Sequence, residues 1–181
     1  IARKLGVQPP SLYKYFPSRI AVYDALFLRG QAEHLEVIRA AIEAAEPGLA
    51  AVYAAMEAST RWAHANQVLA QLLFWRPVPG FEPSEAAMAP SVEMVERFRG
   101  AVRTAVSNGE LGRAAASDDG IALLSVVQAG VVSQQLANQP EASFDAGRFT
   151  SLIDAATGMF VATFPSDPKR TTRTSKKGRT G

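Results

Sequence analysis

Apolar residues recur three or four positions apart along most of the chain, and the strict alternation that is typical of β-strands is nearly absent. Alanine, the strongest helix former, is the most abundant residue, with 32 copies. We therefore predict an all-α fold. The longest expected helix runs from Arg19 to about Ala45, with Ser18 as its N-cap. Its apolar residues share one broad face: Tyr23, Leu26, Phe27, Leu35, Ile38 and Ile42.

Breaks in this periodicity divide the rest of the chain. Pro47 and Gly48 end the first long helix, and the segment 76–84 contains three prolines and a glycine, which predicts a loop. Asn66 is expected to cap a short helix. The further helices expected are Leu49 to about Ala65, 67–75, about Pro90 or Ser91 to Ser107, about 117–139 and about 145–164.

The N-terminal segment has a distinct pattern. Residues 1–5 place Ile1 and Leu5 on one helix face, and Gly6 can form the turn that ends such a helix. Prolines 9 and 10 suit the first turn of a second, short helix, which ends before Pro17. Two helices joined by a tight turn are the geometry of a helix-turn-helix, whose second helix enters the major groove of DNA.

The net charge of +2 is the sum of three blocks of different charge along the chain. Residues 1–19 carry four basic and no acidic side chains, and residues 169–181 carry six basic and no acidic side chains. The segment between them holds all 17 acidic residues against nine arginines. Basic ends of this kind indicate contact with nucleic acid, or, for the last block, a solvated tail.

The run 1–19, IARKLGVQPPSLYKYFPSR, resembles the DNA-binding motif of tetracycline-repressor-like (TetR-family) regulators. The resemblance rests on three features: the Ala2-x-x-Leu5-Gly6-Val7 turn, the Leu12-Tyr13…Phe16 cluster, and the Ser18-Arg19 pair. It implies a homodimeric regulator, most often a repressor, that binds double-stranded operator DNA and is released by a small-molecule effector. Its two recognition helices would lie about 34–36 Å apart.

By this resemblance, the start of the short helix faces bases and its tyrosines and basic residues reach phosphates. The candidate DNA-binding residues are Gln8, Pro9, Pro10, Ser11, Tyr13, Lys14, Tyr15 and Arg19. Two positions depart from the family pattern, which usually has Ser or Thr at Gln8 and His at Tyr15. Family members also have a helix before this point, so we expect the sequence to begin inside a longer protein. The alternative is a helical small-molecule-binding dimerisation module that does not bind DNA.

The remainder resembles the effector domain of the same family, most closely over residues 71–84. Aromatic and methionine side chains cluster around the proline loop, and such side chains with a few polar groups are typical of ligand sites. The candidate ligand-binding residues are Met56, Trp62, Gln71, Phe74, Trp75, Phe81, Met94, Phe98 and Gln128. Of the two histidines, His34 is expected to be a solvated helix residue and His64 a surface or hydrogen-bonded residue near a helix end.

The last two helices, 117–139 and 145–164, carry more small and apolar residues than one core needs. These include Ala122, Val126, Ala129, Gly130, Ser133, Ala137, Ala155, Gly158 and Ala162. Small residues let helices approach closely, so a two-fold contact would form a four-helix bundle between two copies.

Several classes of protein are excluded or disfavoured. With no cysteine, the chain has no disulfide, thiolate metal site or cysteine nucleophile, and it carries none of the common enzyme fingerprints. We expect no enzyme activity, no cofactor and no bound metal. The absence of a secretory signal and of a long apolar run predicts a cytoplasmic protein with no membrane partner. The expected domains are 1–45 (partial DNA-binding domain and connecting helix), 46–165 (effector-binding and dimerisation domain) and 166–181 (basic disordered tail).

Overall fold

A computed structural model describes residues 16–167, and every regular element within them is a helix, as the sequence predicts. The α-helices are α2 (Arg19–Ala44), α3 (Leu49–Ala65), α4 (Gln67–Trp75), α5 (Glu85–Ser107), α6 (Asp118–Asn138) and α7 (Ile153–Thr163). Two short 3-10 helices, η2 (Arg113–Ala116) and η3 (Thr150–Leu152), precede α6 and α7 and were not expected. The residues before Phe16 and after Asp167 lie outside the described part, including the predicted short helices of the DNA-binding motif.

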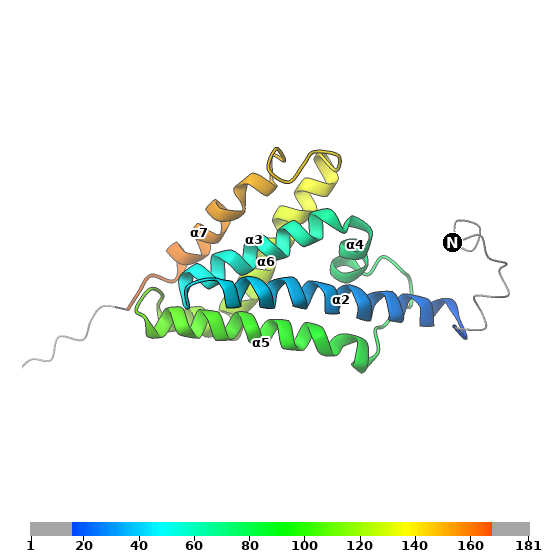
Figure 1. The fold of residues 1–181 in the computed structure, drawn as a ribbon, viewed down its shortest axis with the longest axis horizontal. Coiled ribbons are helices and arrows are strands. Elements are labelled where there is room, and N and C mark those ends of the chain that lie inside the picture. Colours follow the sequence, from blue (N-terminus) through cyan, green and yellow to red (C-terminus); the bar gives the residue numbers. More distant parts are fainter. Residues whose placement is uncertain (1–15, 168–181) are drawn as a thin grey trace, which may run out of the picture.

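The long helices α2 and α5 lie side by side, and α3 packs across both (Figure 1). Helices α6 and α7 cover the other side of α3, and the short α4 sits beside α2 and α3. The first turns of α2 extend beyond the other helices at one end of the molecule (Figure 1). Helix α2 is therefore both a central packing element and the continuation of the N-terminal segment.

Local capping explains why several helices begin where the sequence predicts. The side chain of Ser18 accepts a hydrogen bond from Ala21 N at the start of α2, and Ser117 accepts one from Gly120 N at the start of α6. Each bond satisfies a backbone donor that has no partner inside its helix. Helix α3 spans the expected residues, Leu49–Ala65, after the break at Gly48, whose φ of 119° disfavours any other residue.

Two helix starts differ from the prediction. Helix α5 begins at Glu85, not at Pro90 or Ser91, because Ser84 caps it through Ala87 N. Pro90 is accommodated in its second turn. Helix α7 begins at Ile153, not at residue 145.

The side chain of Gln135 explains the late start of α7. This buried residue of α6 accepts hydrogen bonds from the backbone N–H groups of Phe149 and Thr150, at 3.0 and 3.3 Å, and donates one to Gln139 O. The same side chain thus ties both ends of the loop after α6 and holds the preceding segment out of a helix.

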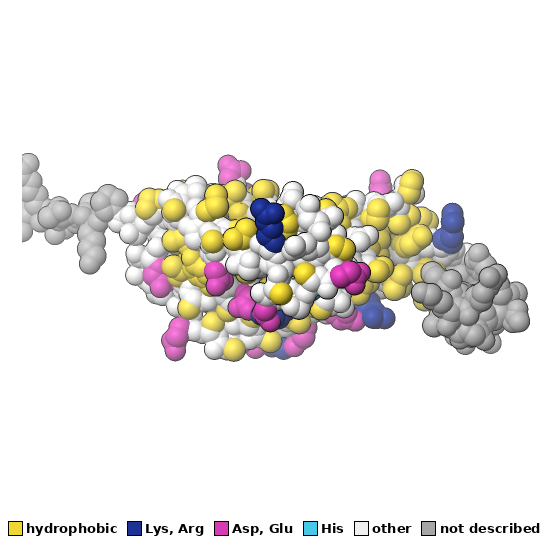
Figure 2. Space-filling model, turned by 90° about the horizontal axis from the view of Figure 1, so that it is seen from above, with side chains coloured by type: hydrophobic (Ala, Val, Ile, Leu, Met, Phe, Trp, Pro, Cys, Tyr) yellow, Lys and Arg dark blue, Asp and Glu magenta, His cyan; other side chains and the backbone are white. Residues whose placement is uncertain are grey.

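One surface formed by α6 and α7 is apolar and open. We call it the α6–α7 face, and it includes Leu152 of η3; its exposed apolar and small residues are Ala122, Val126, Gly130, Ala137, Leu152, Ala155, Met159 and Ala162. Val126 and Met159 are 66% and 71% exposed, and a Cβ atom added to Gly130 would meet nothing within 4 Å. Seen from above, acidic side chains gather toward one long edge of the molecule and hydrophobic side chains spread over much of the rest (Figure 2).

Candidate ligand-binding cavity

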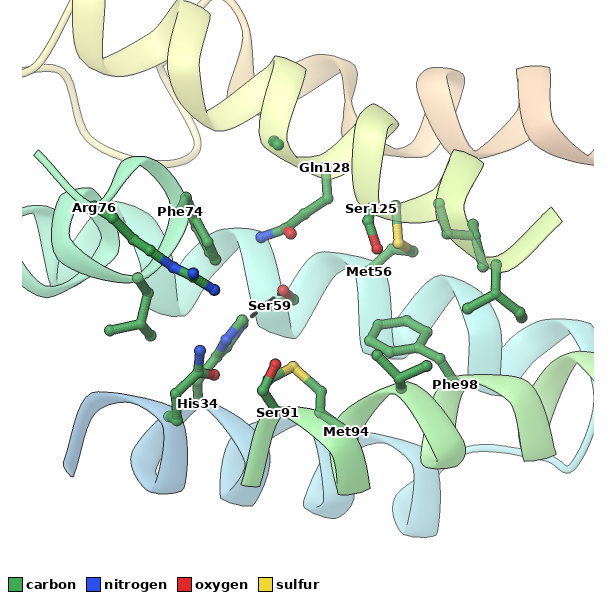
Figure 3. Close-up of a pocket in the computed structure, with 16 residues that line it drawn as sticks. His34, Met56, Ser59, Phe74, Arg76, Ser91, Met94, Phe98, Ser125 and Gln128 are labelled. Atoms are coloured by element: carbon green, nitrogen blue, oxygen red, sulfur yellow. Dashed lines mark hydrogen bonds between the residues drawn. The ribbon is translucent and has the colours of Figure 1, made fainter. Parts of the chain in front are cut away.

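A cavity of about 310 Å³ lies between α2, α3, α5 and α6, with the end of α4 closing one side. This volume is at the lower end of the range for small-molecule sites, about 300–1,000 Å³. Figure 3 shows side chains from all of these elements pointing into the space. The wall consists of Gln31, His34, Met56, Ser59, Leu73, Phe74, Arg76, Ser91, Met94, Val95, Phe98, Ile121, Leu124, Ser125, Gln128 and Ala129.

His34 is the central polar residue of the α2 wall. Its Nε2 atom lies 2.7 Å from Ser59 Oγ, and its ring stacks on Trp62 with a centroid distance of 4.5 Å. Phe74 meets the same imidazole edge-on. Because this burial penalises the charged ring, the pKa of His34 falls from 6.5 to about 4, so the imidazole is neutral at neutral pH.

Two glutamines face the cavity from opposite walls. Gln31 lies on α2, three residues before His34, and Gln128 reaches down from α6 (Figure 3). Both side chains are buried, and Gln31 Oε1 and Gln128 Nε2 form no hydrogen bond with any described residue. The cavity is therefore lined by two buried amides, each with one atom, an acceptor on Gln31 and a donor on Gln128, that no residue of 16–167 pairs.

Arg76 supplies a positive charge beside the cavity. It follows α4 in the left-handed conformation, with φ 45°, which turns the chain into the proline loop. Its guanidinium reaches toward the cavity (Figure 3) and lies 5.7 Å from the ring centre of Phe27. The ion pairs among residues 16–167 do not include it.

Five of the nine ligand residues suggested by the sequence line this cavity: Met56, Phe74, Met94, Phe98 and Gln128. The other four do not. Trp62 lies behind His34, and Phe81 is buried against Phe27 with ring centres 5.9 Å apart. Gln71 and Trp75 are exposed and lie in a shallow surface groove beside α6.

Several cavity residues were not identified from the sequence. His34, expected to be solvated, is 2% exposed, which corrects that prediction. Gln31 and Ser59 are polar residues whose burial depends on neighbouring helices, so no local pattern marks them. Ser91 is half-buried and Ser125 is exposed, and both line the cavity from neighbouring helices. His64 donates to Ala142 O from the last turn of α3, as a hydrogen-bonded residue near a helix end should.

Among the candidate DNA-binding residues, only Arg19 lies in the described part, as the exposed first residue of α2. Gln8, Pro9, Pro10, Ser11, Tyr13, Lys14 and Tyr15 lie outside it.

Within residues 16–167 no group of three His, Asp or Glu side chains is placed to hold a metal ion. Helix α6 is long and apolar enough to cross a membrane by length and composition alone. Of its most apolar 18-residue stretch, 33% is buried inside the protein. Core helices of soluble proteins meet the same criterion, so this is weak evidence for a span.

The fold has a structural relative, whereas no known family model and no curated protein matches the chain. The relative is a protein with unknown function from Rhodococcus sp. RHA1. It superposes with a TM-score of 0.68 over 91% of this chain and 82% of the relative, at 22% sequence identity. At that identity the similarity concerns the fold alone.

Proposed function

We propose that this protein is a ligand-responsive transcriptional regulator, most simply a repressor, that binds operator DNA as a homodimer. The observation that supports this most directly is the position of α2. Gln31 and His34 on α2 form one wall of the cavity, and the same helix begins at Arg19, at the end of the segment that resembles a TetR-family DNA-binding motif. A ligand in the cavity would contact the helix that leads to that motif.

A second contact extends this coupling to α5. The Asp24 carboxylate of α2 accepts hydrogen bonds from the backbone N and the hydroxyl of Ser84, at 2.7 and 2.8 Å. Ser84 caps α5, which contributes Met94 and Phe98 to the cavity. A ligand that shifts α5 would therefore pull on the N-terminal third of α2. A coupling free energy of about 1–3 kcal/mol would change DNA affinity roughly 5- to 150-fold.

The α6–α7 face supplies the proposed dimer contact. After Asp119, α6 carries no charged residue, and the face combines small side chains with the exposed Val126 and Met159. Two copies of this face related by a two-fold axis would pack α6 and α7 against their equivalents as a four-helix bundle. A cytoplasmic location and the absence of catalytic activity are part of this proposal.

The alternative is a dimeric module that binds a small molecule without binding DNA. The cavity and the α6–α7 face support it equally well, and the DNA-binding motif separates the two hypotheses. The decisive experiment selects DNA sequences with the full-length product of the gene and measures binding at low salt, with and without ligand. A pseudo-palindromic site is expected, because a two-fold dimer contacts two inverted half-sites.

Substitutions sharpen this test. Lys14→Ala, at a predicted phosphate contact, should weaken binding to all sequences and lower the log–log salt slope by about 1.8, which is about 0.9 for each copy in the dimer. Ser11→Ala should instead change sequence preference. Arg103→Ala, an exposed arginine of α5, is the matched control and should bind normally. If the full-length protein binds no sequence selectively under any ligand condition, the regulator is excluded in favour of the binding module.

A further inference from the structure

Three buried polar atoms on the cavity wall have no hydrogen-bond partner in the described part of the chain: Gln31 Oε1, His34 Nδ1 and Gln128 Nε2. The three residues are only 5%, 2% and 8% exposed. Folded proteins pair nearly all such atoms, because burial removes their hydrogen bonds to water and an unpaired atom gains no hydrogen bond in return. All three residues line one cavity, although the three atoms themselves are closed to a water-sized probe, so a single bound molecule can supply the missing partners once these side chains turn toward it.

The chemistry of these atoms specifies the polar part of that molecule. Gln31 offers an acceptor from α2, and Gln128 offers a donor from α6 on the opposite wall. His34 Nδ1 donates if the Ser59 hydroxyl donates to Nε2, and it accepts in the other tautomer. The partner must therefore both donate and accept hydrogen bonds.

The charges around the cavity restrict the ligand further. No acidic side chain of residues 16–167 lines the wall, and Arg76 is its one basic side chain apart from the neutral His34. A cationic ligand would be desolvated there without a counter-ion, which is unfavourable. An ionised carboxylate would suit Arg76, but it only accepts hydrogen bonds, so it pairs with the NH2 end of a glutamine amide and leaves Gln31 Oε1 without a donor in the observed orientation. A neutral polar group satisfies both glutamines.

Apolar side chains form most of the remaining wall. Phe74, Met94, Phe98 and Leu124 surround the space, which at about 30 Å³ for each water molecule corresponds to roughly ten waters. A single aromatic ring with a small polar group has the volume of roughly four of those waters, so it fills part of the space and replaces part of that water.

We propose that the cavity binds a compact, largely apolar, uncharged molecule with an amide-like edge, such as an aromatic carboxamide or a lactam, held between Gln31 and Gln128. The inference rests on the proposed function only in taking this cavity as the effector site. It names the chemical class of the effector.

Four matched probes test the proposal: benzamide, benzoate, toluene and benzylammonium, measured by ligand-observed NMR with the whole chain. Benzamide should bind most tightly. Toluene and benzoate should bind about tenfold more weakly, because each leaves at least one glutamine unpaired, and benzylammonium should show no binding. Equal binding of toluene and benzamide would overturn the proposal, as would binding of benzylammonium. The absence of binding by all four would also overturn it and would indicate that ordered water is the hydrogen-bond partner of the three atoms.

Substitution of Gln128 isolates the hydrogen bond. Gln128→Met removes the donor at nearly constant size and should weaken benzamide binding about tenfold while leaving toluene binding unchanged. Retained toluene binding also shows that the variant is folded. Gln134→Met, at an exposed glutamine of the same helix, is the control and should bind benzamide normally. Unchanged benzamide binding to Gln128→Met would refute the proposed contact. No step involves DNA, so failure here leaves the DNA-binding test of the proposed function undecided, and failure there leaves this result standing.

Discussion

His34 of α2 and Ser59 of α3 form a buried hydrogen bond, with 2.7 Å between Nε2 and Oγ, at the point where both helices line the cavity. Trp62, one turn further along α3, stacks on the face of the imidazole. The pair therefore fixes the position of α2 against α3 beside the proposed ligand. It also places a titratable group in the protein interior, where its protonation and its contacts can be measured.

The buried state of His34 predicts a pH-dependent stability. Its pKa is about 4 in the folded protein and 6.5 in the unfolded chain, so below pH 6.5 the unfolded chain takes up a proton that the folded protein excludes. The contribution of His34 to the free energy of unfolding is therefore at its maximum above pH 6.5. It falls by about 1.4 kcal/mol per pH unit as the pH drops from 6.5 toward 4. Urea unfolding at pH 7 and pH 5 should show this loss, about 2 kcal/mol, and His34→Gln should lack it. A matched His64→Gln variant keeps His34 and should keep its contribution; equal pH dependence in the His34→Gln protein would contradict the assignment.

The two tryptophans should report ligand binding differently. Trp62 stacks on His34 and is buried, whereas Trp75 is 42% exposed and lies outside the cavity. Benzamide bound beside His34 should therefore change the emission of Trp62. A fluorescence titration should retain this saturable change in Trp75→Phe and lose it in Trp62→Phe. If the change is instead lost in Trp75→Phe and retained in Trp62→Phe, the ligand binds in the groove beside Trp75.

A charge in the α6–α7 face should dissociate the proposed dimer. Gly130→Arg would bury an unpaired guanidinium between two copies, at a cost of about 3–5 kcal/mol. Gly100→Arg on α5 is the matched control, because an added Cβ at either glycine meets nothing within 4 Å. Both changes replace a helix glycine and should raise helix stability by about 1 kcal/mol. Light scattering should show a monomer for Gly130→Arg and a dimer for Gly100→Arg; a dimer in both would place the interface elsewhere.

The Gln135 side chain should contribute strongly to stability. Gln135→Leu would leave the N–H groups of Phe149 and Thr150 and the carbonyl of Gln139 without their partner. An unpaired buried group costs about 1–3 kcal/mol. Because Thr150 is buried whereas the hydrogen bonds to Phe149 and Gln139 are only partly buried, a total loss of about 2 kcal/mol is expected in urea unfolding. The neighbouring exposed Gln134→Leu should change the free energy of unfolding by less than about 0.5 kcal/mol. A similarly small effect at Gln135 would show that the loop does not depend on it.

Local chemistry along the chain was sufficient to predict the helical class and most helix ends. The starts of α2 and α6 follow from the serine caps at Ser18 and Ser117, and the end of α4 and the loop at 76–84 follow from prolines and a glycine. Caps and breakers act within a few residues, so a sequence displays them directly. The same periodicity identified residues such as Met56 and Phe98 as members of an apolar cluster.

Contacts between residues far apart in the sequence decided the remaining features: two helix starts, the burial of His34 and the cavity. Asp24 and Ser84 are 60 positions apart in the sequence, and Gln135 and Thr150 are 15 apart. Each pair forms a hydrogen bond next to a helix start that the sequence did not predict, that of α5 or α7. The burial of His34 likewise requires Ser59 and Trp62, and the cavity requires a wall from each of four helices. A polar residue is stable in a helix whether it faces water or a buried partner, and only the packing of the other helices determines which of the two it meets.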